Sequence, residues 1–226
     1  MSEEIPTGDV VDNEDELDED ASVTQKHLTE TEGSSTMEIK QTDQMVIGGK
    51  KGSGKTNLMK TLIKWLLSVK CPVIIIDPLW EYKEFEPQGA TVIHIKYGNV
   101  AEFNSYINKL FTKWKGILVI DEADGFLPNK TNLLNPSRTL IHLGRHYGIG
   151  SAFVTRRLSN MHTDVISQTG KLFLFRLYAG ADAQYLERAQ LGEIVDPVFN
   201  LEKYWFVSYD ADTATIQVNE PIPKYQ

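Results

Sequence analysis

Residues 48–56, GGKKGSGKT, decide the fold that this sequence predicts. From Gly49 to Thr56 they read G-x-x-x-x-G-K-T, after an expected buried strand, QMVIGG (44–49), and at the start of an expected helix (55–70). Glycines let the backbone amides turn inward around phosphate groups without a Cβ clash, and the amino end of the helix adds positive partial charge. The motif in this context predicts a P-loop nucleotide-binding domain.

The loop also predicts the residues that hold the nucleotide. We expect Lys55 to reach the β- and γ-phosphates of ATP, and Thr56 to hold Mg²⁺ through its hydroxyl. The implied cofactors are therefore ATP and Mg²⁺. The expected nucleotide-binding residues are Gly49, Lys50, Lys51, Gly52, Ser53, Gly54, Lys55, Thr56 and Asn57.

An acid at the end of a second buried strand would complete such a site, and ILVIDEAD (117–124) supplies one. Asp121 follows the apolar run, so we expect it to bind Mg²⁺ through water. Glu122 comes next and is expected to polarise the attacking water, which favours an NTP hydrolase over a small-molecule kinase. The alternative is that Glu122 only pairs with a neighbouring lysine. Asp124 is interpreted as a surface residue.

The rest of the chain alternates strands with helices, which predicts an α/β fold. Further strands are expected at 71–77, 91–98, 151–155 and 171–177, helices at 100–114, 136–148 and 182–192, and a hairpin within 203–218. The pattern predicts a P-loop NTPase of the RecA/FtsK-like type, with a mainly parallel sheet flanked by helices and a C-terminal β-hairpin.

Charge divides the chain into two regions. The whole sequence has 31 acidic and 23 basic residues and a net charge of −8, but the acids are concentrated near the N-terminus. We expect residues 1–37 to form an acidic disordered tail, because they contain too few large apolar groups to offset the entropy of ordering. The P-loop domain is expected to span 38–226. The tail is either a solubility segment or a docking segment that repels nucleic acid until displaced.

Cysteine content and hydropathy narrow the class of protein further. Cys71 is the single cysteine, so no disulfide can form within the chain. No run of about 18 apolar residues is present, so we expect no stable membrane insertion. The acidic N-terminus lacks the apolar core of a secretory signal.

Three branches of P-loop proteins compete for this pattern. A GTPase would need an N-K-x-D motif, and the nearest string, NKTN (129–132), lacks the acid. A small-molecule phosphotransferase would need an arginine-bearing lid, for which Arg156 and Arg157 are candidates, but it leaves Glu122 without a clear role. The third branch is a ring-forming motor ATPase, in which an arginine from the neighbouring subunit completes each site.

Five segments in order carry a resemblance to a known family: GGKKGSGKT, VIIIDPLWEY, ILVIDEAD, GRHYGIGSAFVTRRLSNMHTDVISQT and LFLFRL. Together they resemble the HerA/FtsK superfamily of DNA-translocating ATPases, over roughly residues 44–209. Within it the chain looks most like the genome-packaging ATPases of tailless icosahedral viruses with an internal membrane. Cellular HerA proteins carry additional domains for which this chain has no room, and this favours the viral group.

The resemblance implies roles for residues around the strand at 151–155. In the family pattern the arginine of GRxxGIG lies at the subunit interface, so Arg145 is the candidate arginine finger acting in trans. The alternative is that Arg145 only neutralises the dipole at the end of its helix. The family strand usually ends in Thr-Gln, where the glutamine senses the γ-phosphate. Here Thr155 is followed by Arg156, which is expected either to contact the γ-phosphate or to act across the interface. Asp77 is expected near the site and Glu81 in a structural hydrogen bond.

The resemblance implies ATP-driven translocation of double-stranded DNA, with packaging of a viral genome into a preformed capsid. It also implies a homo-oligomeric ring, hexamer or pentamer, a capsid or portal-vertex protein as partner, and location in the virion or the host cytoplasm. A HerA-like cellular DNA translocase, a small-molecule phosphotransferase and an assembly or secretion component remain as alternatives.

Three further features are interpreted conservatively. His142 and His146 have helical i, i+4 spacing but no visible third ligand, so they are not expected to bind metal. Trp80 and Tyr82 are expected to pack beside the sheet and not to stack on adenine. Lys130, in the polar loop 124–135, is a candidate contact to the DNA backbone, and the alternative is an ordinary surface loop.

Overall fold

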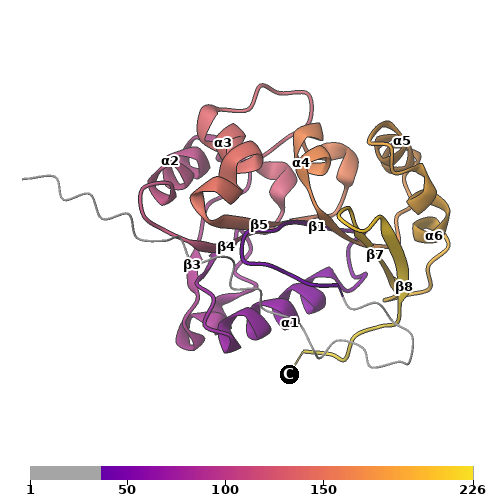
Figure 1. The fold of residues 1–226 in the computed structure, drawn as a ribbon, viewed down its shortest axis with the longest axis horizontal. Coiled ribbons are helices and arrows are strands. Elements are labelled where there is room, and N and C mark those ends of the chain that lie inside the picture. The colour runs from indigo at the N-terminus through magenta and orange to yellow at the C-terminus, as the bar shows by residue number, and fades with distance from the viewer. Residues whose placement is uncertain (1–36, 226) are drawn as a thin grey trace, which may run out of the picture.

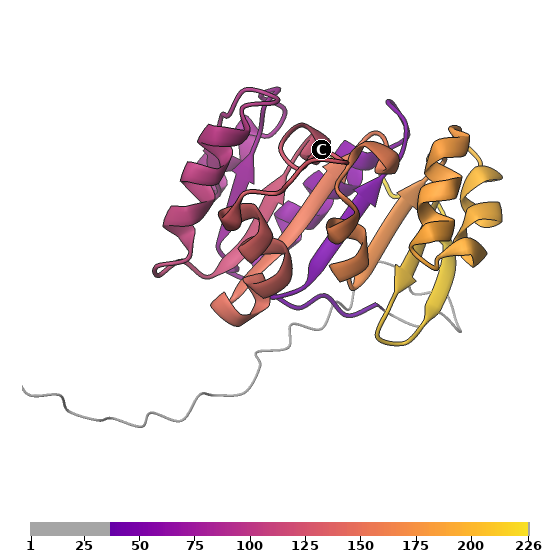
Figure 2. The same cartoon turned by 90° about the horizontal axis from the view of Figure 1, so that it is seen from above.

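The computed structural model describes residues 37–225, which form a central sheet covered by helices on both faces (Figures 1 and 2). The sheet has eight strands in the order β3-β2-β4-β5-β1-β6-β7-β8. The predicted acidic tail lies outside the described residues, apart from Met37. The strands are β1 (Gln44–Gly48), β2 (Val73–Ile76), β3 (Thr91–Ile93), β4 (Gly116–Ile120), β5 (Ile149–Thr155), β6 (Lys171–Phe175), β7 (Phe206–Asp210) and β8 (Thr215–Asn219).

The strands from β3 to β6 in this order pair in parallel, and β7 and β8 extend the sheet as the predicted antiparallel hairpin. One face carries α1 (Lys55–Ser68) and the 3₁₀ helix η1 (Lys83–Gln88) (Figure 1). The other face carries α2 (Val100–Leu110), α3 (Asn135–Leu143), α4 (Thr163–Gln168), α5 (Gly180–Arg188) and α6 (Val195–Phe199). Short 3₁₀ turns are η2 (Ala123–Gly125), η3 (Gly144–Tyr147), η4 (Leu158–Asn160) and η5 (Gly192–Ile194). The predicted α/β class with a mainly parallel sheet is confirmed.

Both faces of the central strands are buried, which explains why these strands read as continuous apolar runs. In β1, Val46 belongs to the core on the face covered by α2–α6, whereas Met45 and Ile47 belong to the core on the α1 face. Leu58 and Leu62 are among the residues that form the buried stripe of α1.

Several predicted elements are shorter in the structure. The strand expected at 91–98 ends at Ile93, because β3 is an edge strand and its partner β2 ends at Ile76. The helix expected at 136–148 ends at Leu143 and continues as η3, whose last turn is closed by Gly148 at a φ of 71°. The helix expected at 100–114 ends at Leu110. Helices α4 and α6 were not predicted.

The parallel topology brings the chemically interesting loops to one edge of the sheet. The register pairs Gly48 with Thr155, and Ile120 with Ile76 on one side and Phe153 on the other. The loops that follow β1, β4, β5 and β2 therefore leave the sheet side by side. Ligands of open α/β sheets bind at this carboxyl edge.

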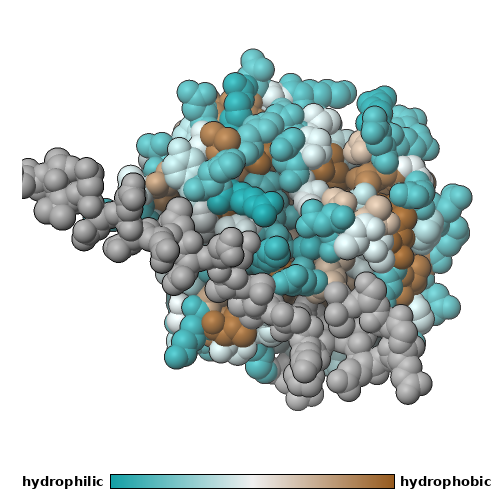
Figure 3. Space-filling model, viewed as in Figure 1, coloured by the Kyte–Doolittle hydropathy of each residue, from teal (hydrophilic) through white to brown (hydrophobic). Residues whose placement is uncertain are grey.

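Within residues 37–225 no helix has the length and apolar character needed to cross a bilayer. The face seen in Figure 3 is largely hydrophilic, with hydrophobic residues in separate groups.

Candidate active site

The loop between β1 and α1 has the shape that the phosphate motif requires. Gly49, Gly52 and Gly54 have φ values of 147°, 75° and 117°, a region that side-chain-bearing residues rarely adopt. A Cβ on Gly49 would lie 2.7 Å from Cβ of Phe175, so the loop also needs glycine for space. The loop passes directly into α1 at Lys55, so its amides and the helix amino end face the same place.

Two side chains in the loop are arranged for an anionic ligand. Lys55 is buried, and its Nζ donates to the carbonyl oxygen of Lys50 at 3.0 Å across the loop. Burial lowers the pKa of Lys55, and the nearby carboxylates of Glu122 and Asp121 oppose that shift. Ser53 Oγ is buried without a hydrogen-bond partner in the described part of the chain. A phosphate oxygen would satisfy both groups.

Acidic and hydroxyl groups gather beside the loop at the ends of β4 and β2. Asp121 is 5% exposed, and burial together with the charge of Glu122 raises its pKa to about 7. Thr56 Oγ1 donates to Glu81 Oε2 at 3.3 Å. Tyr82 Oη is buried with no hydrogen-bond partner among residues 37–225.

This donor set fits a hydrated Mg²⁺ ion. Carboxylate and hydroxyl oxygens are the ligands that Mg²⁺ takes from proteins, and the ion keeps several waters. A cation beside Asp121 would offset the cost of burying its charge. Asp77 is not part of this donor set. Its carboxylate accepts hydrogen bonds from the backbone amides of Leu79 and Tyr82 at 3.1 and 2.8 Å. Asp77 therefore shapes the loop after β2.

Glu122 forms an ion pair with Arg156 of the same chain. Pairing with a neighbouring lysine was the alternative role expected for Glu122 from the sequence. In the structure Glu122 pairs with an arginine instead. Glu122 adopts a left-handed conformation with φ 47°, which turns its side chain toward the end of β5. Burial raises the pKa of Glu122, and Arg156 opposes that shift. Arg156 therefore contacts the expected general base within its own subunit.

The interpretation of Asp124 as a surface residue is wrong. Thr155 Oγ1 donates to Asp124 Oδ1 at 2.9 Å, and the Tyr97 hydroxyl donates to Asp124 Oδ2 at 3.2 Å. Thr155 ends β5, so Asp124 links the acidic loop after β4 to the strand that carries Arg156. Beside this link an open pocket of about 370 Å³ is lined in part by Glu122, Asp124 and Arg156.

Arg145 lies far from the phosphate loop of its own subunit. It is exposed in η3, just before the seven-residue strand β5, whereas the loop faces the other end of that strand. At about 3.3 Å per residue, β5 separates the two by roughly 20 Å. Arg145 therefore cannot act on the nucleotide of its own chain.

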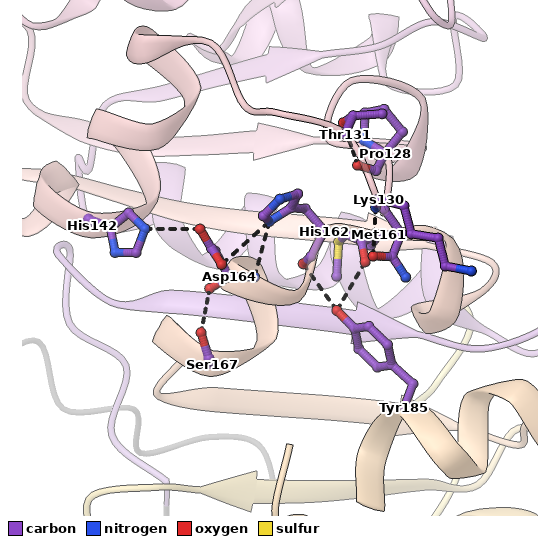
Figure 4. Close-up of polar contacts among 10 residues, drawn as sticks. Pro128, Lys130, Thr131, His142, Met161, His162, Asp164, Ser167 and Tyr185 are labelled. Carbon is purple, nitrogen blue, oxygen red and sulfur yellow. Dashed lines mark hydrogen bonds and ion pairs between the residues drawn. The ribbon is translucent and has the colours of Figure 1, made fainter. Parts of the chain in front are cut away.

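The loop that contains Lys130 is anchored to the segment after β5 by hydrogen bonds and by a bridge between Pro128 and Met161. Asn129 donates through its backbone amide to Asn160 O at 2.7 Å and through its side chain to Ser159 O at 2.9 Å. Lys130 itself is exposed with φ 60°, and its side chain extends away from these contacts in Figure 4. The loop is thus held at the same edge as the candidate site.

His142 makes a side-chain contact, and the two aromatic residues Trp80 and Tyr82 differ in their burial. His142 Nε2 lies 3.2 Å from Asp164 Oδ2 (Figure 4), and the described residues contain no cluster of three or more His, Cys, Asp or Glu side chains suited to a metal ion. Tyr82 is fully buried, as expected. The expectation that Trp80 packs beside the sheet is wrong, because Trp80 is 52% exposed and its ring stacks on His94 with 4.3 Å between centroids. The expected hydrogen bond of Glu81 is confirmed, with Thr56 as its partner, whereas sequence reasoning missed the contacts of Tyr97 and Asp124. The run of acids after β4 was the available signal for Asp124.

Comparison with known proteins supports the assignment of the site to a P-loop ATPase. Residues 41–140 match the family described as "Helicase HerA, central domain". The probable DNA double-strand break repair helicase HerA of Methanocaldococcus jannaschii is 32% identical over 81 residues, which are 34% of this chain and 16% of that protein. The chain thus matches only a small part of the curated relative's length.

Solved structures with the same fold include viral enzymes. The DNA-packaging ATPase B204 from Sulfolobus Turreted Icosahedral Virus is 25% identical with a TM-score of 0.73, covering 80% of this chain and 98% of that chain. The genome packaging NTPase B204 from Sulfolobus turreted icosahedral virus 2, in complex with AMPPCP, is 24% identical with a TM-score of 0.71, covering 81% and 100%.

The fold and the phosphate-loop site define a P-loop ATPase. The HerA match over residues 41–140 and the shared fold confirm the resemblance to the HerA/FtsK superfamily.

Proposed function

We propose that this chain is an ATP-driven motor that moves double-stranded DNA. The observation that carries the proposal is the meeting of the phosphate loop, the Asp121–Glu122 pair and Arg156 at one edge of the sheet. These are the groups that an NTP hydrolase needs, because a carboxylate beside the phosphate loop can accept a proton from the water that attacks the γ-phosphate.

ATP binding is assigned to the loop and the start of α1. Backbone amides from Gly49 to Asn57 cradle the phosphates, and Ser53 Oγ is free to donate to a phosphate oxygen. Lys55 exchanges its contact with the Lys50 carbonyl for the β- and γ-phosphates.

Thr56 and Asp121 are the residues that would hold Mg²⁺, which would neutralise charge on the phosphate oxygens. Glu81 accepts the hydrogen of the Thr56 hydroxyl, so it turns a lone pair of that oxygen toward Asp121.

Hydrolysis is assigned to Glu122 and Arg156. Glu122 orients the attacking water and accepts its proton at a carboxylate oxygen. Arg156 leaves Glu122 when ATP binds, and its guanidinium then faces the γ-phosphoryl group, where negative charge is redistributed in the transition state. The exchange frees the base at the moment the substrate is in place. Arg156 thus takes the position of the family's glutamine with a charged group.

The position of Arg145 supports the proposed ring. The resemblance assigns it to the subunit interface, and its distance from its own loop leaves the neighbouring subunit as its target. A homo-oligomeric ring, pentamer or hexamer, would present Arg145 of one subunit to the site of the next. An arginine finger of this kind contributes about 10³–10⁵ in rate in other P-loop proteins.

Coupling to DNA is assigned to the links between β4, β5 and the loop of Lys130. Thr155 binds Asp124, and two residues of η4 hold Asn129. A shift of Arg156 on hydrolysis would therefore reach Lys130 through bonded neighbours. Lys130 contacts phosphate groups of the duplex, so this contact is independent of sequence and sensitive to salt.

Packaging into a preformed capsid is the biological setting we propose, with a capsid or portal-vertex protein as partner and the virion or host cytoplasm as location. Support comes from the fold shared with the B204 packaging ATPases over about 80% of this chain. A HerA-like cellular translocase is the alternative setting for the same motor.

A small-molecule phosphotransferase is the second candidate function, because the open pocket of about 370 Å³ beside Glu122 has room for an acceptor. Hydrolysis assays with and without duplex DNA separate the two. A motor hydrolyses ATP faster on DNA, whereas a phosphotransferase is indifferent to DNA and leaves the phosphate on an acceptor nucleotide.

A further inference from the structure

A group of exposed hydrophobic side chains surrounds the open pocket at the carboxyl edge of the sheet. This group, called the pocket rim below, consists of Leu79, Trp80 and Tyr97. Leu79 and Tyr97 line the pocket of about 370 Å³ that also contains Glu122, and Trp80 follows Leu79 in the loop after β2. Single exposed hydrophobic residues are common on protein surfaces, but a cluster beside a pocket marks a binding surface.

Trp80 is held in its exposed position by a strained backbone. Its φ is 61°, in the left-handed region that a bulky side chain rarely adopts. The carboxylate of Asp77 accepts hydrogen bonds from the amides of Leu79 and Tyr82, which fixes the chain on both sides of Trp80. The indole ring stacks on His94 with 6° between the ring planes, and Trp80 still remains 52% exposed. Backbone strain that presents a large ring to solvent is typical of a functional surface.

A second group of exposed hydrophobic side chains lies at the opposite, amino edge of the sheet. This group, called the η3 face below, consists of Leu143, Arg145 and Tyr147. The Tyr147 ring lies 5.0 Å from the Phe111 ring, so the turn after α2, with the exposed Lys115, adjoins this face. Within residues 37–225 no ion pair joins Arg145 to a carboxylate. The η3 face therefore combines apolar side chains with an unpaired cation.

The two groups fit a contact between two copies of this chain. Strand β5, roughly 20 Å long, separates them within one subunit, so they cannot cover each other there. A contact between two different surfaces of identical subunits is head-to-tail, and it forms a ring when the rotation between subunits closes. The pocket rim of one subunit and the η3 face of the next are two such surfaces.

The charges of the two surfaces favour this contact when nucleotide is bound. The pocket contains two acids, Glu122 and Asp124, and two arginines, Arg156 and Arg157, so its own charges balance. The phosphates of a bound nucleotide add negative charge at this edge of the sheet. The cationic η3 face, with Arg145, then becomes its electrostatic complement, and association is strongest with nucleotide present.

We propose that the pocket rim of one subunit binds the η3 face of the next subunit, with Trp80 as the central anchor. The inference rests on the proposed function in requiring a ring, and it names the surface that joins the subunits. Leu143 and Tyr147 cover the rim and exclude water from it, and Arg145, between them in sequence, enters beside Glu122. Large rigid side chains such as that of Trp80 contribute most of the binding free energy in protein interfaces.

The test measures particle mass with Mg²⁺, AMPPCP and duplex DNA present. Trp80→Ala is compared with Tyr204→Ala, because Tyr204 is also an exposed aromatic residue with a left-handed backbone, at φ 72°. Leu143→Asn is compared with Leu134→Asn, an exposed leucine at the other end of α3. We expect Trp80→Ala to weaken each contact about thirtyfold or more, the effect of losing an interface anchor. Trp80→Ala and Leu143→Asn should then be monomers at concentrations where wild type and both controls form rings.

A mixture of the two variants tests whether the two surfaces bind each other. The Trp80→Ala subunit keeps its η3 face, and the Leu143→Asn subunit keeps its pocket rim. One intact contact can therefore form, and the mixture should contain a 1:1 pair that neither variant forms alone. Rings stay absent, because the next contact would lack both groups. A purely structural role of Trp80 would not produce this pair.

Binding of AMPPCP to each variant verifies that it is folded, and Leu79→Asn repeats the rim test without altering the backbone at Trp80. Rings of wild-type mass in both rim variants would overturn the docking surface and leave the proposed motor intact. Absence of the 1:1 pair from the mixture would also overturn it. Rim variants that keep their rings but lose duplex binding would assign the rim to DNA instead. A wild type that stays monomeric would refute the proposed ring itself.

Discussion

Arg156 is the residue whose replacement separates the proposed roles most sharply. The substitution Arg156→Gln removes the guanidinium that pairs with Glu122 and introduces the residue that the family carries after Thr155. The substitution should lower the free energy of unfolding slightly and kcat strongly. The ion pair contributes to the free energy of unfolding, and the positive charge contributes to kcat.

The effect on folding is small because the pair is open to water. The Arg156 side chain is 44% exposed and that of Glu122 is 13% exposed. Exposed ion pairs contribute about 0.2–1 kcal/mol to stability, since water and salt screen them. For a domain of this size a loss of 1 kcal/mol lowers Tm by about 2–4 °C. A thermal scan of Arg156→Gln should therefore lie within a few degrees of wild type.

The effect on hydrolysis is large if Arg156 faces the γ-phosphoryl group. Removing one preorganised donor from developing negative charge costs about 10²–10³ in kcat. Because the glutamine amide still donates one hydrogen bond, we expect a loss of about 10² and a KM changed less than about fivefold. Steady-state phosphate release measures both. Arg156→Lys keeps the charge without the planar fork and should fall between the two.

One result would refute this reasoning about Arg156. A kcat equal to or above that of wild type, with an unchanged Tm, would show that the pair only restrains Glu122 before ATP binds. Arg156 would then have no part in the transition state, and the family's glutamine would serve equally well at that position.

Three further predictions concern other parts of the motor. Glu122→Gln should keep AMPPCP binding and lower kcat by about 10²–10⁴, the usual contribution of a general base, and retained turnover would remove its assigned role. Arg145→Ala mixed with Lys55→Ala should recover activity, because an interface between unlike subunits joins one intact loop to one intact finger. If mixed rings form without hydrolysis, the trans role is wrong. Lys130→Ala should weaken duplex binding and reduce the slope of log K against log salt by about 1, with Lys113→Ala as the exposed control. An equal effect of both lysines in a DNA-binding titration would contradict a specific contact.

The sequence predicted those parts of the fold that depend on local pattern. The phosphate loop, the apolar run before Asp121 and the C-terminal hairpin are each set by neighbours in the chain, and all three lie where expected. Strand β3 was predicted too long because its length depends on its partner. Periodicity in 91–98 carries no information about where β2 ends.

The contacts within the site depended on tertiary structure. The ion pair of Arg156 with Glu122 needs β4 and β5 to be neighbours in the sheet, an order that periodicity does not specify. Asp124 read as a surface acid, yet it satisfies the Thr155 hydroxyl across the same pair of strands. Asn57 was expected at the nucleotide, and its bond to Pro223 spans 166 residues of sequence.

The most direct test of the central claim is ATP hydrolysis on duplex DNA combined with displacement of a third strand annealed to that duplex. A motor that moves along double-stranded DNA predicts faster phosphate release with duplex present. It also predicts ATP-dependent displacement of the third strand, and Glu122→Gln abolishes both. A hydrolysis rate that duplex DNA leaves unchanged, with the third strand retained, would contradict the account.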